Sequence, residues 1–388
     1  MKIFTSQTNY NLPTCDYNLI WATLALLGIG LVMVYSSSIA LAAASSVLDH
    51  QSHHYLLRQA IFISIGFFAG YICFLIPIYF WQKIAPILFI VGIILLIIVL
   101  IPGIGKEYGG SQRWIPLGII NFQPSELVKL FSVMYVSDYV LRKSKQIRTI
   151  VKGFLPILAV IVLTGYLLLQ QPDFGASAVI VGTAMGILFL GGLTYKIFIS
   201  LIFLAPPIIY YLITSAAYRL VRWQVFLNPY EDRFGSGWQL TNSLQALGRG
   251  EIFGSGLGAS IAKLHYLPEP HTDHIVAVIG EEFGLFGVAI IIMLFGYLVV
   301  RMFGIAKESI QNKKHFSSLM SQGVTIWFAI QGIINIGSAI GFIPPKGITL
   351  PLVSYGGTGM LVNMVAIAII LRIDHDNRKN MRGQSYKI

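Results

Sequence analysis

The hydrophobic positions of this chain fall in long runs, without the alternation of polar and apolar residues that a barrel strand would show. A helix needs about 20 mostly apolar residues to cross the hydrocarbon core of a bilayer. Ten runs approach that length, and they predict ten spanning helices at residues 19–41, 56–76, 84–101, 123–140, 153–169, 175–192, 198–215, 276–300, 318–342 and 356–372.

Composition supports the same picture. Hydrophobic residues make up 55% of the 388 positions and charged residues 11%, against about 25% charged in an average soluble domain. We therefore predict an all-α polytopic membrane protein that forms a single integral membrane domain over residues 1–388. The first run is too long for a signal peptide, so an uncleaved helix is expected. Cys15 and Cys73 are expected to be structural.

The distribution of lysine and arginine predicts the orientation of these helices. An even number of spans places both termini on one side of the membrane. If that side is cytoplasmic, the inner segments hold 17 of these residues and the outer segments 9, which agrees with their usual enrichment in cytoplasmic loops. The net charge of +11 then requires no nucleic acid partner. One long extracytoplasmic loop, at about 216–275, joins the seventh and eighth spans.

Glu126 and Lys129 fall within the fourth predicted span, where a charge in hydrocarbon is costly. Glu126 and Lys129 are three residues apart and therefore share one helical face. One interpretation is an internal ion pair that neutralises itself. The other is that Lys129 is partly free to neutralise a phosphate while Glu126 orients it.

Further polar residues flank the outer ends of the predicted spans. Asp173 follows Pro172, at which a helix must break, and it either caps the next helix or joins Lys129 in a polar cavity. Arg113 and Trp114 precede the fourth span. Trp114 is either a residue of the interfacial aromatic belt or a platform on which a sugar stacks.

The segment His271-Thr272-Asp273-His274 stands just before the eighth span. A zinc site fits poorly, because no third ligand follows at a recognisable spacing. Asp273 either caps the span or acts as a general base, tuned by a partly dry environment and nearby cations. Glu281 and Glu282 follow two turns later, and we expect one of them to pair with an arginine.

Five stretches carry a resemblance that covers the chain from the first span to the last. They are GLVMVYSSS at 30–38, RWIPLGIINFQPSELVKL at 113–130, QPDFG at 171–175, YLPEPHTDHIVAVIGEEFGLFG at 266–287 and PPKGITLPLVSYGGTGM at 344–360. Together they resemble the SEDS family (shape, elongation, division and sporulation) of peptidoglycan glycosyltransferases, and its cell-division branch more than its elongation branch. His274 stands where Phe is more usual, which removes no charged group.

The resemblance implies a ten-span fold with both termini inside and the polymerisation of lipid II on the outer face of the cytoplasmic membrane, at the division septum. The essential aspartate of the family falls on Asp273, and its intramembrane lysine and aspartate fall on Lys129 and Asp173. The implied partners are a class B penicillin-binding protein that acts as transpeptidase, other division proteins and membrane lipid.

On this basis we expect one inverting displacement at C1 of the lipid II donor, with Asp273 as the general base. Lys129, Arg219 and Arg222 are expected to meet the charge of the leaving pyrophosphate, with a divalent cation such as Mg²⁺ as helper or substitute. Glu126, Asp173, Arg113, Trp114 and His271 complete the expected substrate-binding set. A lipid II flippase, an elongation-type polymerase and a noncatalytic scaffold for division proteins stay open as alternatives.

Overall fold

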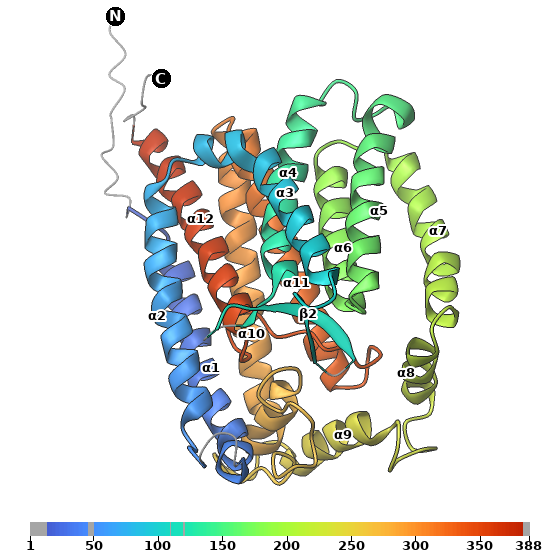
Figure 1. The fold of residues 1–388 in the computed structure, drawn as a ribbon. Coiled ribbons are helices and arrows are strands. Elements are labelled where there is room, and N and C mark those ends of the chain that lie inside the picture. Colours follow the sequence, from blue (N-terminus) through green and yellow to red (C-terminus); the bar gives the residue numbers. More distant parts are fainter. Residues whose placement is uncertain (1–13, 46–49, 109, 119–120, 383–388) are drawn as a thin grey trace, which may run out of the picture.

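The computed structural model describes residues 14–45, 50–108, 110–118 and 121–382. Within these ranges a helix occupies each of the ten predicted spans (Figure 1). In chain order they are α1 (Tyr17–Ala44), α2 (His54–Leu75), α3 (Ile78–Leu100), α4 (Pro124–Arg142), α5 (Leu155–Gln170, preceded by a π-helical turn at Ile150–Phe154), α6 (Phe174–Leu190), α7 (Tyr195–Thr214), α10 (Ile275–Gln311), α11 (His315–Ala339) and α12 (Gly357–Met381).

Eight helices of the described part are long and apolar enough to cross a membrane. The other two differ in length and in charge. The apolar helix α6 has only 17 residues, and α4 includes four charged residues among its 19, namely Glu126, Lys129, Asp138 and Arg142. The predicted class, an all-α polytopic membrane protein, is confirmed.

The helices differ strongly in how deeply they are buried. In α11 and α12, 61% and 72% of the most apolar 18-residue window lies inside the bundle, against none for α7. Trp327 and Phe328 of α11 are among the largest fully buried side chains. By contrast α7 stands at the edge of the bundle, next to α8 (Figure 1). A helix with no buried side chain is stabilised mainly by its surroundings, which for this chain means lipid.

Both ends of the described chain meet at one end of the bundle. His375 Nδ1 of α12 lies 3.1 Å from the Thr14 carbonyl oxygen, just before α1. The segment between α7 and α10 lies at the opposite end (Figure 1). An even number of spans requires this arrangement.

Five elements outside the spans were not predicted from the apolar runs. They are α8 (Ala217–Leu227), α9 (Trp238–Gly250), β1 (Lys106–Tyr108), β2 (Ser111–Pro116) and β3 (Asn121–Phe122). The strands form a small antiparallel sheet in the order β1-β2-β3, between α3 and α4. Most side chains of β2 are half-buried on both faces, so the strand has no clear polar and apolar alternation. This sheet positions Arg113 and Trp114, which project from opposite faces of β2.

Two buried acids of α10 fasten the segment that contains α8 and α9. Glu281 pairs with Arg249 at 3.4 Å, so the expected arginine partner is present. Glu282 pairs with Lys263 at 2.7 Å, and both side chains are almost fully buried. The outer segment is therefore held against α10 by charge as well as by packing.

A kink in α10 makes room for this segment. Gly284 has φ 67° and ψ −162°, a combination that glycine tolerates and other residues avoid. A Cβ atom at Gly284 would lie 2.5 Å from the backbone nitrogen of Gly254 in the outer segment. The two backbones pack this closely only because both residues lack a side chain.

Candidate active site

Asp273 lies in the turn that leads into α10, at the end of the bundle that carries α8 and α9. Asn335 of α11 donates a hydrogen bond from Nδ2 to the Asp273 carbonyl oxygen at 3.1 Å and another to the Ile348 carbonyl oxygen at 2.6 Å. Gly347 packs directly against the carboxylate, since a Cβ there would lie 2.9 Å from Asp273 Oδ2. The backbone of Asp273 is thus held by α11 and by the segment between α11 and α12.

The Asp273 carboxylate is half-buried and surrounded by charges of both signs. Burial raises its pKa from 3.8 to about 7, and the nearby Glu269 carboxylate raises the pKa as well. Arg113 and Arg222 act in the opposite direction. Among the described residues, none donates a hydrogen bond to this carboxylate, and the helix cap of α10 is His274 rather than Asp273. The carboxylate is available to an incoming group.

Arg113 joins the sheet to the broken end of α5. Its Nε donates to the Gln171 carbonyl oxygen at 3.2 Å, and Nη2 donates to the Pro172 carbonyl oxygen. Its Nη1 is 3.9 Å from Asp173 Oδ1. Asp173 also caps α6, because its Oδ1 accepts the Ala176 N–H at 3.0 Å. Asp173 is thus the predicted helix cap, and its charged neighbour here is Arg113, while the predicted cluster with Lys129 stays a prediction.

Lys129 and Glu126 form a buried ion pair in α4, with Nζ 2.8 Å from Oε1. Lys129 Nζ also donates to Gln331 Oε1 of α11 at 2.9 Å and lies 5.3 Å from the centre of the Trp327 ring. Ser125, the residue before Glu126 on α4, has its Oγ 3.4 Å from Asp173 Oδ2. In this conformation two of the three donors of Lys129 are occupied.

The two histidines beside Asp273 are buried and neutral. Burial lowers the pKa of His271 and of His274 to about 4. The His271 ring lies 4.3 Å from the Tyr55 ring and 5.4 Å from the Tyr355 ring, between centroids, and His274 Nε2 contacts Gln239 Nε2. Within the described ranges no group of three or more His, Cys, Asp or Glu side chains is placed to hold a metal ion.

Basic residues from three separate segments surround the carboxylates. Arg219 and Arg222 lie on α8, where each guanidinium packs over the Tyr218 ring, at 5.5 and 5.9 Å from its centre. Lys346, between α11 and α12, lies 4.0 Å from the centre of the Phe174 ring. Burial, together with the charges of Arg222 and Arg219, lowers its pKa to about 8. Arg113 completes the cluster from the sheet.

Sequence reasoning did not select Lys346, Gly347 or Asn335. The stretch PPKGITLPLVSYGGTGM contains Lys346 and Gly347. A lysine that stands between two prolines and a glycine, near the end of a helix, is only a weak signal of a functional residue. Asn335 is a polar residue in an apolar span, which was the stronger clue. Their approach to Asp273 depends on how the α11–α12 segment folds back over the site.

Together these features define a class of protein: a polytopic membrane protein with a carboxylate of raised pKa and a cluster of cations at one end of its helical bundle. Such a site suits a substrate that carries negative charge and a proton to be removed. The chain belongs to the family described as Cell cycle protein, which groups FtsW, RodA and SpoVE, and the family model matches residues 17–379.

Individual relatives agree with this assignment. A protein of Aromatoleum aromaticum named Probable peptidoglycan glycosyltransferase FtsW is 48% identical over 96% of this chain and 91% of its own length. A protein of the same name from Burkholderia thailandensis is 46% identical over 95% of this chain and 80% of its own length.

Solved structures share the fold at lower identity. One is described as "Structural coordination of polymerization and crosslinking by a peptidoglycan synthase complex"; it matches with a TM-score of 0.77 at 23% identity, over 94% of this chain and 98% of the other. The rod shape determining protein RodA of Thermus thermophilus matches with a TM-score of 0.66 at 24% identity, over 94% of this chain and 97% of the other.

Proposed function

We propose that this chain is a peptidoglycan glycosyltransferase of cell division that polymerises lipid II into glycan strands at the outer face of the cytoplasmic membrane. Membership of the family and the names of its relatives support the activity. The observation that carries the chemical proposal is the Asp273 carboxylate, which has a pKa of about 7 and faces a cluster of cations.

The reaction joins two sugars in one displacement. The C4 hydroxyl oxygen of the acceptor N-acetylglucosamine forms a bond to C1 of the donor N-acetylmuramic acid, while the bond from C1 to the pyrophosphate oxygen breaks. Asp273 accepts the hydroxyl proton. A base is most effective when its pKa lies near the working pH, which the environment of Asp273 provides. An α-linked donor thereby becomes a β-linked product without a covalent enzyme intermediate.

The leaving undecaprenyl pyrophosphate takes the bonding electrons and needs cations around it. Arg113, Arg219, Arg222 and Lys346 supply positive charge from the sheet, from α8 and from the α11–α12 segment. Donors aimed at a developing oxyanion each contribute about 10²- to 10³-fold in rate when the site excludes water. The Lys129–Glu126 pair is buried in the bundle, and its contact with pyrophosphate stays a prediction.

We include a divalent cation in the proposal only as an ion bound to the pyrophosphate of the substrate. Among the described residues no group of three or more His, Cys, Asp or Glu side chains is placed to hold a metal ion, and Mg²⁺ usually binds through substrate phosphates with few protein ligands. Mg²⁺ would therefore arrive as a counter-ion of the pyrophosphate. Titration with EDTA tests this: activity that persists at low ionic strength without free metal would show that the protein cations suffice.

The proposed partner is a class B penicillin-binding protein, with which this chain would work at the division septum. A structural neighbour was described within a peptidoglycan synthase complex, which supports a synthase partner. The lysine and arginine distribution supports termini in the cytoplasm. Crosslinking of the glycan strands would come from the partner.

The deciding experiment is a polymerisation assay on the purified full chain with its cognate transpeptidase, lipid II and Mg²⁺, with the products resolved on a gel. We expect a glycan ladder that Asp273→Ala abolishes. Glu231→Gln, which neutralises an exposed acid of the same outer segment, should leave the ladder intact. A folded wild type that makes no ladder and instead moves lipid II across liposomes would overturn the proposal in favour of a flippase.

A further inference from the structure

A row of buried polar side chains runs along one face of α11, towards the end of the bundle that carries Asp273. Trp327, Gln331 and Asn335 stand four residues apart and therefore share that face. All three side chains are fully buried. Buried polar groups are costly unless they are paired, so the partners of this row indicate what it does.

Gln331 joins α11 to the segment between α11 and α12. Its Oε1 accepts hydrogen bonds from Trp327 Nε1 at 2.7 Å and from Lys129 Nζ at 2.9 Å. Its Nε2 donates to the Thr349 carbonyl oxygen at 2.9 Å. One amide group therefore connects the Lys129–Glu126 ion pair of α4 to the α11–α12 segment.

Asn335 makes a second connection one turn further along α11. Its Nδ2 donates to the Ile348 carbonyl oxygen at 2.6 Å and to the Asp273 carbonyl oxygen at 3.1 Å. These partners decide the orientation of the amide, because the opposite orientation would place its oxygen against two carbonyl oxygens. A single amino group thus bridges two segments that are far apart in the chain.

The segment held in this way has no helix or strand between residues 344 and 350. Irregular backbone at membrane depth requires partners for its polar groups from outside the segment. The carbonyl groups of Ile348 and Thr349 find theirs on α11. The Leu350 N–H donates to Ser354 Oγ at 2.8 Å. The position of the segment is therefore set by side chains rather than by a regular backbone pattern.

The bridge made by Asn335 lies next to two groups of the candidate site. Lys346 and Gly347 stand immediately before Ile348. A Cβ on Gly347 would lie 2.9 Å from Asp273 Oδ2, so the backbone there packs directly against the carboxylate. A displacement of about 1 Å in an active site can lower the rate about 10²-fold. The separation that Asn335 holds is thus one to which the reaction would be sensitive.

We propose that Asn335 is a positioning residue of the glycosyltransferase site. Its side-chain amide fixes the turn of Asp273 against the segment that carries Lys346 and Gly347. This inference rests on the proposed function, because it gives Asn335 a part in the same reaction. Asn335 acts through the groups that it holds, and Gln331 supports it by holding the next carbonyl group of the segment.

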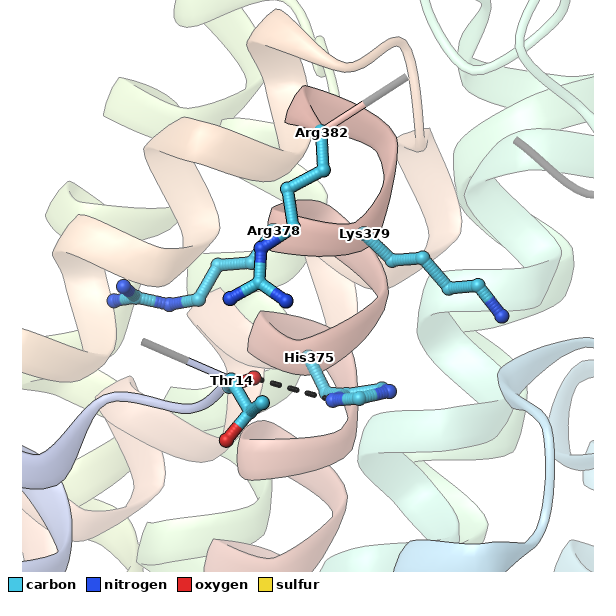
Figure 2. A pocket seen from close by; sticks show the side chains of 5 residues that line it. All are labelled: Thr14, His375, Arg378, Lys379 and Arg382. Carbon is cyan, nitrogen blue, oxygen red and sulfur yellow. Dashed lines mark hydrogen bonds between the residues drawn. The ribbon is translucent and has the colours of Figure 1, made fainter. Parts of the chain in front are cut away.

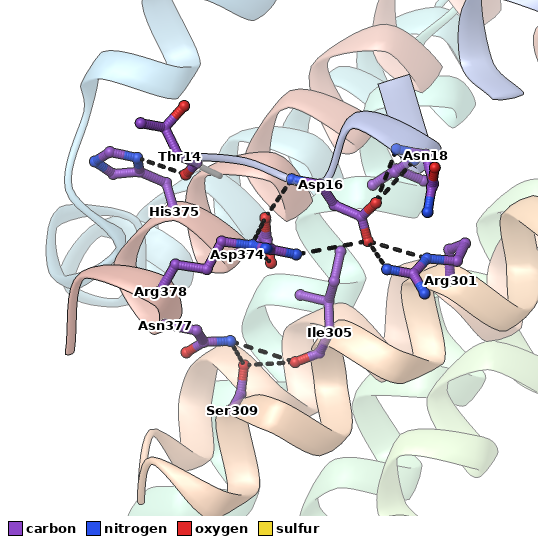
Figure 3. Close-up of polar contacts among 11 residues, drawn as sticks. Thr14, Asp16, Asn18, Arg301, Ile305, Ser309, Asp374, His375, Asn377 and Arg378 are labelled. Atoms are coloured by element: carbon purple, nitrogen blue, oxygen red, sulfur yellow. Dashed lines mark hydrogen bonds and ion pairs between the residues drawn. The ribbon is translucent and has the colours of Figure 1, made fainter. Parts of the chain in front are cut away.

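A buried asparagine at the opposite end of the bundle provides a matched control. Asn377 of α12 lies there, two residues after His375 (Figure 2). Its Nδ2 donates to Ser309 Oγ at 2.8 Å and to the Ile305 carbonyl oxygen at 3.4 Å (Figure 3). Asn377 is fully buried like Asn335, and in both residues Oδ1 has no hydrogen-bond partner among the described residues. Loss of either amide should therefore destabilise the fold to a similar extent.

Polymerisation of fluorescent lipid II by the full-length protein, with its cognate transpeptidase, tests the role of Asn335. Asn335→Leu removes both hydrogen bonds while nearly keeping the shape of the side chain, and Asn377→Leu makes the same change at the control position. We expect Asn335→Leu to lower kcat by about 10- to 100-fold with little change in KM. Asn377→Leu should keep the wild-type kcat although its melting temperature falls as much.

A second substitution keeps the test open if Asn335→Leu does not fold. Asn335→Asp retains the shape of the side chain, but a carboxyl group has at most one O–H donor and cannot bridge two carbonyl oxygens. It should also lower kcat, whereas Asn377→Asp should not. Wild-type kcat in the folded Asn335 variants would overturn the proposal, as would an equal loss of kcat at the control position.

A double-variant cycle with Gly347→Ala separates positioning from a general loss of structure. If Asn335 acts by holding this segment against Asp273, then Asn335→Leu/Gly347→Ala should lose little more activity than the more damaging single variant. Losses that multiply would mean that the two residues act independently, and the positioning role would be wrong.

Hydrogen exchange of the same proteins distinguishes a failure of this inference from a failure of the proposed function. Peptides that cover residues 269–275 and 345–350 should exchange about tenfold faster in Asn335→Leu than in the wild type, and at the wild-type rate in Asn377→Leu. A wild type that makes no glycan would overturn the proposed function, while the exchange rates would still show whether Asn335 holds the two segments together. Unchanged exchange in Asn335→Leu would overturn the positioning role whatever the activity.

Discussion

The pH dependence of polymerisation follows directly from two groups of the candidate site. Asp273 must be ionised to accept a proton, and burial holds its pKa at about 7. Lys346 must be protonated to attract pyrophosphate, and burial beside Arg222 and Arg219 holds its pKa at about 8. The rate should therefore rise through pH 7 and fall above pH 8, with an optimum near 7.5.

The size of the effect follows from the same two pKa values. With pKa values of about 7 and about 8, the fraction of protein with Asp273 ionised and Lys346 protonated is about 0.6 at pH 7.5. It is about 0.09 at pH 6 and at pH 9. We expect kcat/KM to be about sixfold lower at either of these values than at the optimum.

Two substitutions should move the two limbs independently. Glu269→Gln removes a carboxylate that raises the pKa of Asp273, so the acid limb should shift to lower pH and the alkaline limb should stay. Lys346→Arg replaces an ammonium group with a guanidinium group that stays charged throughout, so the fall above pH 8 should disappear. The activity of the Lys346→Arg variant also tests whether the site requires a positive charge at position 346.

The assay measures initial rates with fluorescent lipid II at concentrations well below KM, from pH 5 to 10 at constant ionic strength. Under these conditions the profile reports groups of the free enzyme rather than of the substrate complex. His271 and His274, with pKa values of about 4, do not titrate in this range. An acid limb that Glu269→Gln leaves in place, or moves to higher pH, would refute the assignment of that limb to Asp273.

Three further predictions concern stability and geometry. Asp273→Asn should raise the melting temperature at pH 8 and leave it unchanged at pH 3.5. A carboxyl group whose pKa is raised in the folded protein destabilises the fold only at pH values above its pKa in the unfolded chain. The gain in the free energy of unfolding is at most about 4 kcal/mol, and contact of the half-buried side chain with water reduces it. Lys129→Met should destabilise the fold by about 3–5 kcal/mol by leaving Glu126 buried and unpaired, and Glu126→Gln in the same chain should restore most of it; no rescue would mean that the pair is not the cause. The turnover of this double variant then distinguishes a structural pair from a phosphate contact. Gly347→Ala should lower kcat by about 10- to 100-fold by displacing the carboxylate, whereas Gly248→Ala, with open space around it, should behave as wild type.

Much of the architecture could be predicted from sequence because a membrane makes local composition decisive. Within the bilayer core every apolar run of sufficient length forms a helix, since unpaired backbone groups there are too costly. The ten predicted spans accordingly coincide with ten helices, including α4 with its charged residues. The turn before α10 and the break at Pro172 were also visible, because prolines and charges in such places are rare.

Contacts between segments far apart in the chain could not be predicted in this way. The small sheet that carries Arg113, the kink at Gly284 and the position of Gly347 against Asp273 depend on close approach of backbones, which composition does not encode. The pKa of Lys346 likewise depends on arginines more than 120 positions away.

The sequence by itself determined the membrane class, the places of the helices and the polar residues that hydrocarbon would reject. Local hydrophobicity and the cost of isolated charge are sufficient for that. Only the tertiary structure decided which of those charges meet. It paired Lys129 with Glu126 and left the Asp273 carboxylate open near Arg113 and Arg222, because electrostatic and packing energies depend on distances in space.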